Sequence, residues 1–209
     1  MSAPMVRALL DGRKTQTRRI VKPRKDRSFG CELAPHEIAG EVNSGNFENC
    51  PYGQPGDRLW VREAWNVGAD KHNFYIEYRA DNHIIPRRLD RAKLSPMDDA
   101  VLEKWQDKLA VWNPSIFMPR WASRITLEVV SVRVERLQEI SYEDACAEGC
   151  ELANIRFEPD SNGETWEQTA RRLRWPQRSF CQLWNSIKGA GSWDANPWVW
   201  CVEFKRLEP

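Results

Sequence analysis

The chain has 209 residues, of which 41% are hydrophobic and 29% are charged, and it contains 11 tryptophans. These values are typical of a folded globular protein, and the length fits a single domain with insertions. Lys and Arg number 31 against 30 Asp and Glu, so the net charge of +1 gives no overall electrostatic reason to bind a polyanion. No apolar run is long enough to span a membrane and the first residues do not resemble a secretory signal, so we expect a cytoplasmic monomer without membrane partners.

The six cysteines of a chain without such a signal predict reduced thiols rather than a disulfide framework. Cys31 and Cys50 bracket an irregular segment, and Cys146 and Cys150 are four residues apart. A metal or a bond between Cys31 and Cys50 is the less favoured alternative, because no histidine lies at ligand spacing. We therefore predict buried, unreactive cysteines, no metal and no cofactor.

The first elements are a short helix and a strand. Apolar residues at helical spacing predict a helix from Ala3 to Asp11, and Gly12 stands where a terminating glycine is expected. β-branched residues predict a strand from Thr15 to Val21. Lys22 to Pro55 is rich in Gly, Pro, Asn and Ser without periodicity, and we expect this insertion to lie on the surface with little regular structure.

The middle of the chain predicts a hairpin and a second insertion. The turn signal Gly56-Asp57 precedes a strand from Arg58 to Trp65, which we expect to pair with a strand from Phe74 to Tyr78. Asp81 to Pro119 reads as an insertion, and a serine followed by proline and acidic residues favours a surface helix from Pro96 to Leu109 within it.

The longest strand signal runs from Ser123 to Leu137, and its apolar alternation changes phase near Val130-Ser131, which suggests a bulge. A capping pattern at Ser141 predicts a helix to Glu148, with Gly149 as its terminator.

The remaining elements are helical and then extended. A helix is expected from Glu164 to Ile187 with an interruption at Pro176, partly within a third insertion at 151–175, and a final strand begins at Trp198. Regular βαβ alternation is absent, so the fold class is α+β with a mostly antiparallel sheet curled into a small barrel. The segments expected in one curved sheet are Thr15–Ile20, Arg58–Glu63, Ile125–Leu137 and Trp198–Phe204.

Gly12 to Arg19 is the densest functional candidate. Strand alternation places Thr15, Thr17 and Arg19 on one face and Gln16 and Arg18 on the other, so Lys14 must reach Thr17 from the turn. A threonine hydroxyl needs a neighbouring base to become a nucleophile, and a lysine serves as one only where burial or nearby cations favour the neutral amine. The alternative is an exposed basic strand, because residues 13–27 contain eight Lys or Arg and one acid.

Several residues elsewhere are candidates for the same site. Glu148 would hold a lysine in position and exchange protons with it, with Glu63 as a rival carboxylate. Most tryptophans are expected in the core, although Trp65 is a candidate for stacking on a base. Arg62, Arg19 and Asn196 complete the predicted substrate contacts. The three histidines lie in loops without ligand spacing, and phosphate-loop and nucleophile-elbow motifs are absent, which excludes hydrolytic zinc, ATPase, Rossmann and α/β-hydrolase sites.

The chain resembles the ASCH domain, a relative of the PUA RNA-binding fold, in the versions encoded by bacteriophages and prophages. The resemblance implies a PUA-like barrel, and one branch of the family, the small bacterial N4-acetylcytidine amidohydrolases, is similar at the motif. Carried over by position, it implies Thr17 as nucleophile, Lys14 as its base and Glu148 as proton acceptor and lysine anchor. The segments that carry it are Gly12-x-Lys14-x-x-Thr17-x-Arg19, Gly56-Asp57, Arg136-Leu137-x-x-Ile140-Ser141, Ala147-Glu148-Gly149 and Val202-Glu203-Phe204-Lys205.

Two functions follow as expectations, since a fold does not fix a function. The first is hydrolysis of an amide on a modified nucleoside or base. Other branches of the family are RNA-binding modules or ribonucleases, so the alternative is a basic cleft that grips RNA or single-stranded DNA.

Overall fold

The structure is a computed structural model that describes residues 1–69, 74–87, 112–149 and 165–208. The helix expected from Pro96 to Leu109 lies outside these residues, as does most of the insertion at 151–175. The chain divides into two compact units: the first contains Met1–Leu10, Trp60–Thr126 and Glu208–Pro209, the second Asp11–Leu59 and Leu127–Leu207. No helix in the described part of the chain is long and apolar enough to cross a membrane.

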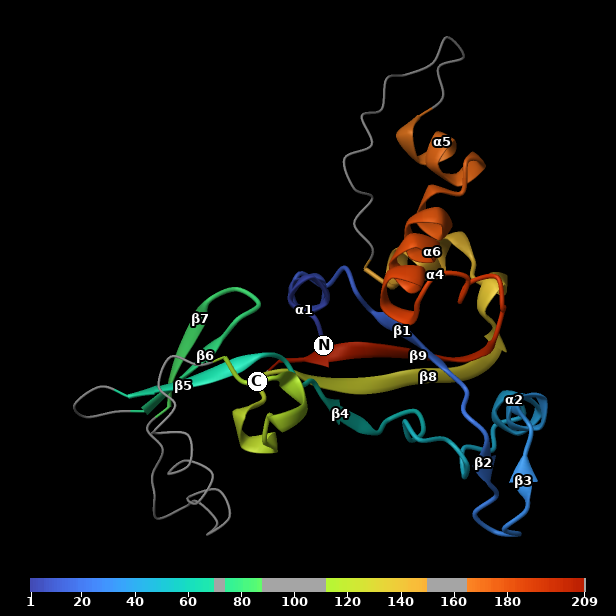
Figure 1. The fold of residues 1–209 in the computed structure, drawn as a ribbon, viewed down its shortest axis with the longest axis horizontal. Coiled ribbons are helices and arrows are strands. Elements are labelled where there is room, and N and C mark those ends of the chain that lie inside the picture. Colours follow the sequence, from blue (N-terminus) through green and yellow to red (C-terminus); the bar gives the residue numbers. More distant parts are fainter. Residues whose placement is uncertain (70–73, 88–111, 150–164, 209) are drawn as a thin grey trace. The chain divides into compact units, whose positions relative to one another are not determined.

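The second unit is built on a four-stranded sheet, in the order β1-β9-β8-β4 (Figure 1). The four segments expected in one sheet do lie in it, as β1 (Gln16–Ile20), β9 (Trp198–Leu207), β8 (Thr126–Arg136) and β4 (Arg58–Trp60). β1 and β9 pair antiparallel, with Gln16 opposite Glu203. The α+β class is confirmed, but the described strands form an open sheet with β1 and β4 at its edges and no closed barrel.

The alternation along β8 changes phase where the sequence indicates. Leu127 and Val129 are buried, Val130 is exposed, and burial resumes at Val132 and Val134. Both halves of this long strand therefore keep their apolar side chains in the interior, although the strand is continuous.

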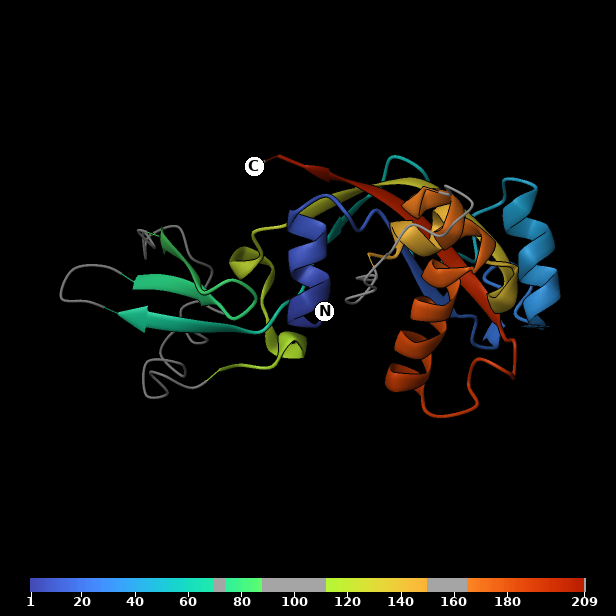
Figure 2. The same cartoon turned by 90° about the horizontal axis from the view of Figure 1, so that it is seen from above.

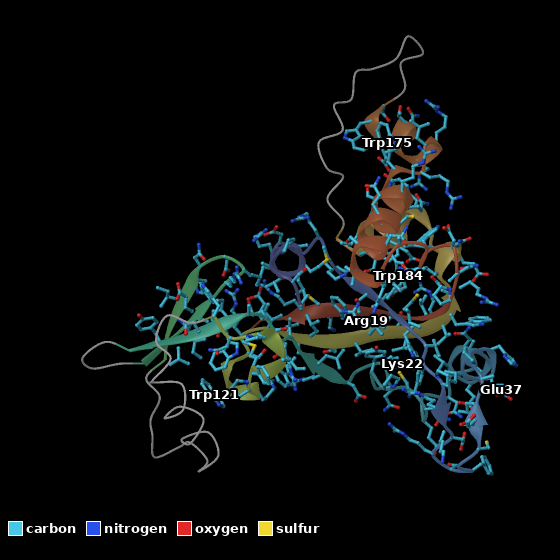
Figure 3. The ribbon with its side chains drawn as sticks, viewed as in Figure 1. Arg19, Lys22, Glu37, Trp121, Trp175 and Trp184 are labelled. Atoms are coloured by element: carbon cyan, nitrogen blue, oxygen red, sulfur yellow. The ribbon has the colours of Figure 1, made fainter. Side chains whose placement is uncertain are left out.

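In the described part of the chain, three α-helices follow β8, namely α4 (Tyr142–Ala147), α5 (Trp166–Arg172) and α6 (Trp175–Lys188). The Ser141 hydroxyl accepts from the Asp144 N–H at the start of α4, as the capping pattern predicts. The expected interruption between α5 and α6 is a left-handed Arg174, with φ of 52°, just before Pro176. Figure 1 shows α4 and α6 on one side of β1 and β9, and Trp184 lies nearer the sheet than Trp175 (Figure 3). The core under these helices contains Leu137, Ile140, Ala145, Phe180, Trp184, Val199 and Cys201.

The prediction that the insertion from Lys22 to Pro55 has little regular structure is wrong. It contains a two-stranded hairpin of β2 (Arg24–Lys25) and β3 (Glu32–Leu33) and the helix α2 (Pro35–Asn43). Figure 1 shows α2 on the other side of β8 and β9 from α4 and α6, and Figure 2 shows it next to the end of β8. Within α2, a proline in the first turn and an apolar stripe that buries Ile38 and Val42 outweigh the local Gly and Pro content.

The first unit combines α1 (Ala3–Leu10) with the antiparallel sheet β5 (Trp65–Ala69), β6 (Phe74–Tyr78) and β7 (His83–Arg87). The predicted pairing of β6 with the run from Arg58 is wrong: β6 pairs with β5, because this register sets Trp65 opposite Tyr78 and Val67 opposite Ile76. All four side chains are then buried in one core, with Met118 and Ala122.

Candidate active site

Lys14 is buried between the start of β1 and the end of α4, with 5% of its surface exposed. Its Nζ donates to the Gln16 carbonyl at 2.7 Å, to the Glu148 carbonyl at 2.8 Å and to Glu148 Oε2 at 2.9 Å. An ammonium has three N–H donors, so these three oxygens satisfy it completely. Lys14 is therefore arranged as a charged donor in this conformation.

Glu148 is held against Lys14 by the backbone as well as by its side chain. It caps the C-terminus of α4, and Gly149 follows with φ of 73°, a conformation that favours glycine and turns the chain away. Lys14 and Glu148 form a β-bridge, and the Thr15 N–H donates to the Ala147 carbonyl at 2.9 Å. The structure thus brings together two residues that are 134 positions apart.

Arg18 is the centre of the charges around this pair, and only 1% of its surface is exposed. It donates to the Gln16 side chain and to three carboxylates: Glu148 at 3.3 Å, Glu135 at 2.6 Å and Asp144 at 2.9 Å. Its guanidinium also lies 5.9 Å from the centre of the Phe180 ring. Glu135 belongs to β8, and Asp144 and Glu148 lie at the two ends of α4, so Arg18 ties β1 to both elements.

Arg133 extends these charges to the surface. It pairs with Glu135 at 3.0 Å, Asp144 at 2.7 Å and Glu203 at 2.6 Å, and 31% of its side chain is exposed. We call the resulting set the charged cluster: Lys14, Arg18, Arg133, Glu135, Asp144, Glu148 and Glu203. It contains three cations and four carboxylates. The solvent exposure of its side chains increases from Arg18, which is fully buried, to Glu203, which is partly exposed.

The cluster favours the ionised forms of Asp144 and Glu135. Burial alone would raise the pKa of Asp144, but the hydrogen bond from Gln16 and the charges of Arg18 and Arg133 lower it further than burial raises it. The pKa of Glu135 is lowered in the same way, against its burial, by the hydrogen bond and charge of Arg18.

Thr17 faces away from this cluster. It lies opposite Val202 in the β1–β9 register, on the other face of β1 from Gln16 and Arg18, as alternation predicts. Its Oγ1 is buried and has no hydrogen-bond partner among the described residues. The structure brings Lys14 and Glu148 together but places no hydrogen bond from either to Thr17, whose nucleophilic role stays a prediction.

Two predicted substrate contacts lie in the same unit, outside the charged cluster. Arg19 is exposed on β1 and donates to the Arg18 carbonyl at 2.8 Å. Asn196 has a left-handed φ of 42° and accepts from the Gln138 N–H at 2.9 Å. Asn196 therefore has a structural role in the turn that leads to β9.

The other three predicted contacts belong to the first unit. Glu63 is 1% exposed, and both its oxygens accept from Arg124 at 2.9 Å. Trp65 is fully buried in the core of that unit, and the Arg62 guanidinium lies 4.5 Å from the centre of the Trp60 ring. These contacts give Glu63 and Trp65 structural roles.

The residues that the sequence analysis missed are Gln16 and Arg18 on β1 and the carboxylates that they bind, Glu135 and Asp144. A signal for two of them was present, because Lys14, Gln16 and Arg18 alternate along one face of the strand. Thr17 and Arg19, which the motif singles out, lie on the opposite face of the strand.

The cysteines do not form a site in the described part of the chain. Cys31, Cys50, Cys146, Cys181 and Cys201 are free thiols, and the prediction that the cysteines are buried is wrong for Cys31 and Cys146, which are exposed. Burial strongly raises the pKa of the Cys201 thiol beside the cluster. No group of three or more metal-binding side chains gathers among the residues that the structure places.

Comparison with known proteins leaves the site to be interpreted from its own chemistry: no family model, no curated protein and no solved structure matches the chain.

Proposed function

We propose that the chain is an amidohydrolase that removes an acyl group from the nitrogen of a modified nucleoside or base, with the Lys14–Glu148 pair as its proton-transfer unit. The observation that carries the proposal is the burial of this pair, with 5% and 4% of the two residues exposed and 2.9 Å between Nζ and Oε2. The resemblance to the ASCH amidohydrolases supplies the reaction class.

A buried lysine–carboxylate pair is explained better by a catalytic role than by a contribution to the stability of the fold. Desolvating two charges costs about as much free energy as their attraction returns, so apolar side chains would serve a core at least as well. Buried ionisable groups with specific partners are concentrated at functional sites. Transfer of one proton from Nζ to Glu148 Oε2, along their existing hydrogen bond, turns Lys14 into a neutral amine that can act as a base.

The proposed reaction forms and then breaks an ester of Thr17. The Thr17 hydroxyl adds to the amide carbonyl carbon while its proton passes to the Lys14 amine. The C–N bond then breaks, and the amine nitrogen of the nucleoside takes a proton from Lys14. Water cleaves the acyl ester and releases a carboxylic acid and the free threonine.

The geometry around Thr17 sets one requirement for this reaction. Lys14 donates to the Gln16 carbonyl, which belongs to the peptide bond that leads into Thr17, so the amine is one peptide group away from the threonine. In the proposed reaction Lys14 exchanges this carbonyl for Thr17 Oγ1, which has no competing partner within the described residues. The substrate must therefore bind where it drives this exchange.

The alternative, a nucleic-acid binding module, loses support from the same observation. Two of the eight basic residues between 13 and 27 are Lys14 and Arg18, which are buried and paired with carboxylates. Arg13 pairs with Asp11 at 2.9 Å on the surface. The basic stripe therefore offers fewer free cations to phosphates than its sequence suggests.

Turnover of a panel of acylated nucleosides, N4-acetylcytidine among them and followed by mass, tests the proposal. We expect Lys14→Ala, Thr17→Ala and Glu148→Gln each to lower kcat by about 10²–10⁴-fold, the usual share of a proton-transfer group, with strongly non-additive double variants. Lys14→Arg should fail as well, because a guanidinium does not release its proton near neutral pH. Lys205→Ala, at an exposed lysine that pairs with Glu128 at 2.7 Å, is the matched control.

Two results would contradict the proposal. Absence of turnover on every acylated nucleoside by the folded protein would remove the reaction class. Full activity in Lys14→Arg would reduce Lys14 to a fixed positive charge and would favour the nucleic-acid alternative.

A further inference from the structure

A separate cavity lies along α6, and neither Lys14 nor Glu148 lines it. It is a groove of about 550 Å³ between α6 and the turns around Gln138 and Trp193, and none of its lining residues belongs to the charged cluster. Its volume is within the range of small-molecule sites, which is about 300–1,000 Å³. The groove lies entirely within the second unit.

The groove carries two cations without partners. Arg174 and Arg178 stand four residues apart at the start of α6, and both are exposed. Neither guanidinium has a hydrogen bond or an ion pair among the described residues, whereas Arg171 nearby pairs with Glu143 at 2.7 Å. Two like charges at this helical spacing repel each other, and the positive end of the helix dipole lies beside them. An anion bound between them would relieve both effects.

One residue that lines the groove also has a buried acceptor without a partner among the described residues. Gln177 lines it with only 8% of its surface exposed, and its Oε1 has no hydrogen-bond partner in the part of the chain that is described. Buried polar atoms are nearly always hydrogen-bonded, so this oxygen calls for a donor from outside the protein. It lies within one helical turn of both arginines.

A flat apolar wall completes the site. Trp193 is half-buried, and its ring meets the Phe180 ring edge to face at 6.1 Å between centroids. Its backbone is fixed by the N–H that it donates to Asn185 Oδ1 at 3.0 Å and by its carbonyl, which accepts from Gln138 Nε2 at 3.0 Å. The indole is thus a rigid surface on which a planar ring can pack.

We propose that this groove binds a nucleoside monophosphate. The phosphate pairs with Arg174 and Arg178 at the start of α6, as phosphates do with guanidinium groups and helix N-termini. The base packs against Trp193 and donates an N–H to Gln177 Oε1. The site does not depend on the proposed hydrolase, because it uses none of the residues of that reaction.

Isothermal titration calorimetry of the full chain with CMP, UMP, AMP and GMP tests this assignment, with the matching nucleosides and inorganic phosphate as separate arms. We expect at least one monophosphate to bind about tenfold or more tightly than its nucleoside and than phosphate, since a charge-assisted pair and a packed ring each contribute. The Arg174→Gln/Arg178→Gln variant should lose at least that factor. Arg171→Gln, which removes the same charge outside the groove, should bind like the parent.

Gln177→Met separates binding from folding. It removes the unpartnered oxygen while keeping the length of the side chain, so the melting temperature should stay or rise while monophosphate affinity falls. Four results overturn the proposal: no monophosphate binds up to millimolar concentration, inorganic phosphate binds as tightly as every nucleotide, the double arginine variant binds like the parent, or a 5′-phosphorylated oligonucleotide binds more tightly than any mononucleotide.

Discussion

Arg18 is the side chain on which the charged cluster depends. It is the one member that contacts carboxylates from β8, from the first turn of α4 and from the end of α4, through Glu135, Asp144 and Glu148. The charge of Lys14 alone cannot neutralise these groups, because Lys14 reaches only Glu148. Arg18 therefore helps to hold the Glu148 carboxylate beside Lys14.

We predict that Arg18→Met destabilises the fold by about 3–5 kcal/mol, the usual cost of leaving a buried charge without its partner. The free energy of unfolding from urea titration measures this. Arg171→Met, which breaks an exposed ion pair with Glu143, should cost about 0–1 kcal/mol. Equal losses in the two variants would show that the cluster contributes no more than a surface ion pair.

The sequence predicted part of this site and not the rest. Lys14 and Glu148 were named because a motif and a helix end pointed to them. Arg18 is not expected in the interior from its residue type, because fully buried arginines are rare, and only the alternation from Lys14 through Gln16 places it there. Glu135 was not identified because nothing in a strand pattern shows which carboxylate an arginine from another strand will meet.

At the scale of elements, α2 protects an open part of the sheet. Gly56 and Asp57, just before β4, pair with Val129, so the neighbour of β8 on that side ends before Val134. The Asn43 side chain takes the place of a strand there: its Nδ2 donates to the Val134 carbonyl and its Oδ1 accepts from the Val134 N–H, both at 3.1 Å. The last residue of α2 thus satisfies a strand edge that would otherwise be unpaired.

We predict that Asn43→Ala lowers the free energy of unfolding by about 1–3 kcal/mol, because both backbone groups of Val134 lose their partners. Asn46→Ala, which removes an exposed contact to the Glu48 N–H, should change it by no more than about 0.5 kcal/mol. Urea titration of both variants is the measurement. If Asn43→Ala lowers the free energy of unfolding no more than Asn46→Ala does, water replaces the hydrogen bonds of the Asn43 side chain to Val134, and the prediction is contradicted.

Elements with a clear apolar pattern along the chain could be predicted from the sequence. Elements and pairings that depend on tertiary contacts could not. β1 and β8 alternate, β9 begins with a continuous apolar run, and all three lie in one sheet as expected. The helix α2 was missed because glycines and prolines surround it, although Ile38 and Val42 show its apolar face. The partner of β6 was misassigned because a register is decided by which side chains share a core, which a single strand does not reveal.

At the scale of the whole molecule, each unit has its own apolar core, and ionic contacts add to both. Trp65 and Tyr78 are buried in the first unit, while Phe180 and Trp184 are buried in the second. In the second unit the charged cluster spans the boundary between the sheet and its helices. Its state of ionisation therefore affects how firmly α4 is held to the sheet.

We predict that stability falls on acidification through this cluster. The pKa values of Asp144 and Glu135 are lower in the folded chain than in the unfolded one, so the unfolded state binds protons first. Their contribution is fully present above the ordinary carboxyl range of about 4 and is lost as the pH falls through the lower folded values. Urea titrations between about pH 6 and pH 2 should show a shallower fall for Asp144→Asn than for the parent. Asp11→Asn, at an exposed ion pair with Arg13, is the control, and an equally shallow fall there would contradict the prediction.

The pairing of β1 with β9 also determines when the site can form during synthesis. Gln16 bonds to Glu203 across 187 residues, and the strand that covers β1 is the last one of the described chain. Contacts between positions so far apart in sequence are slow to form, because a long loop must close before any of them is gained. A ribosome has therefore passed Glu148 and both helices α5 and α6 before it makes the strand that pairs with β1. The segment that carries Lys14, Gln16 and Arg18 is thus held against the sheet only once β9 has been made.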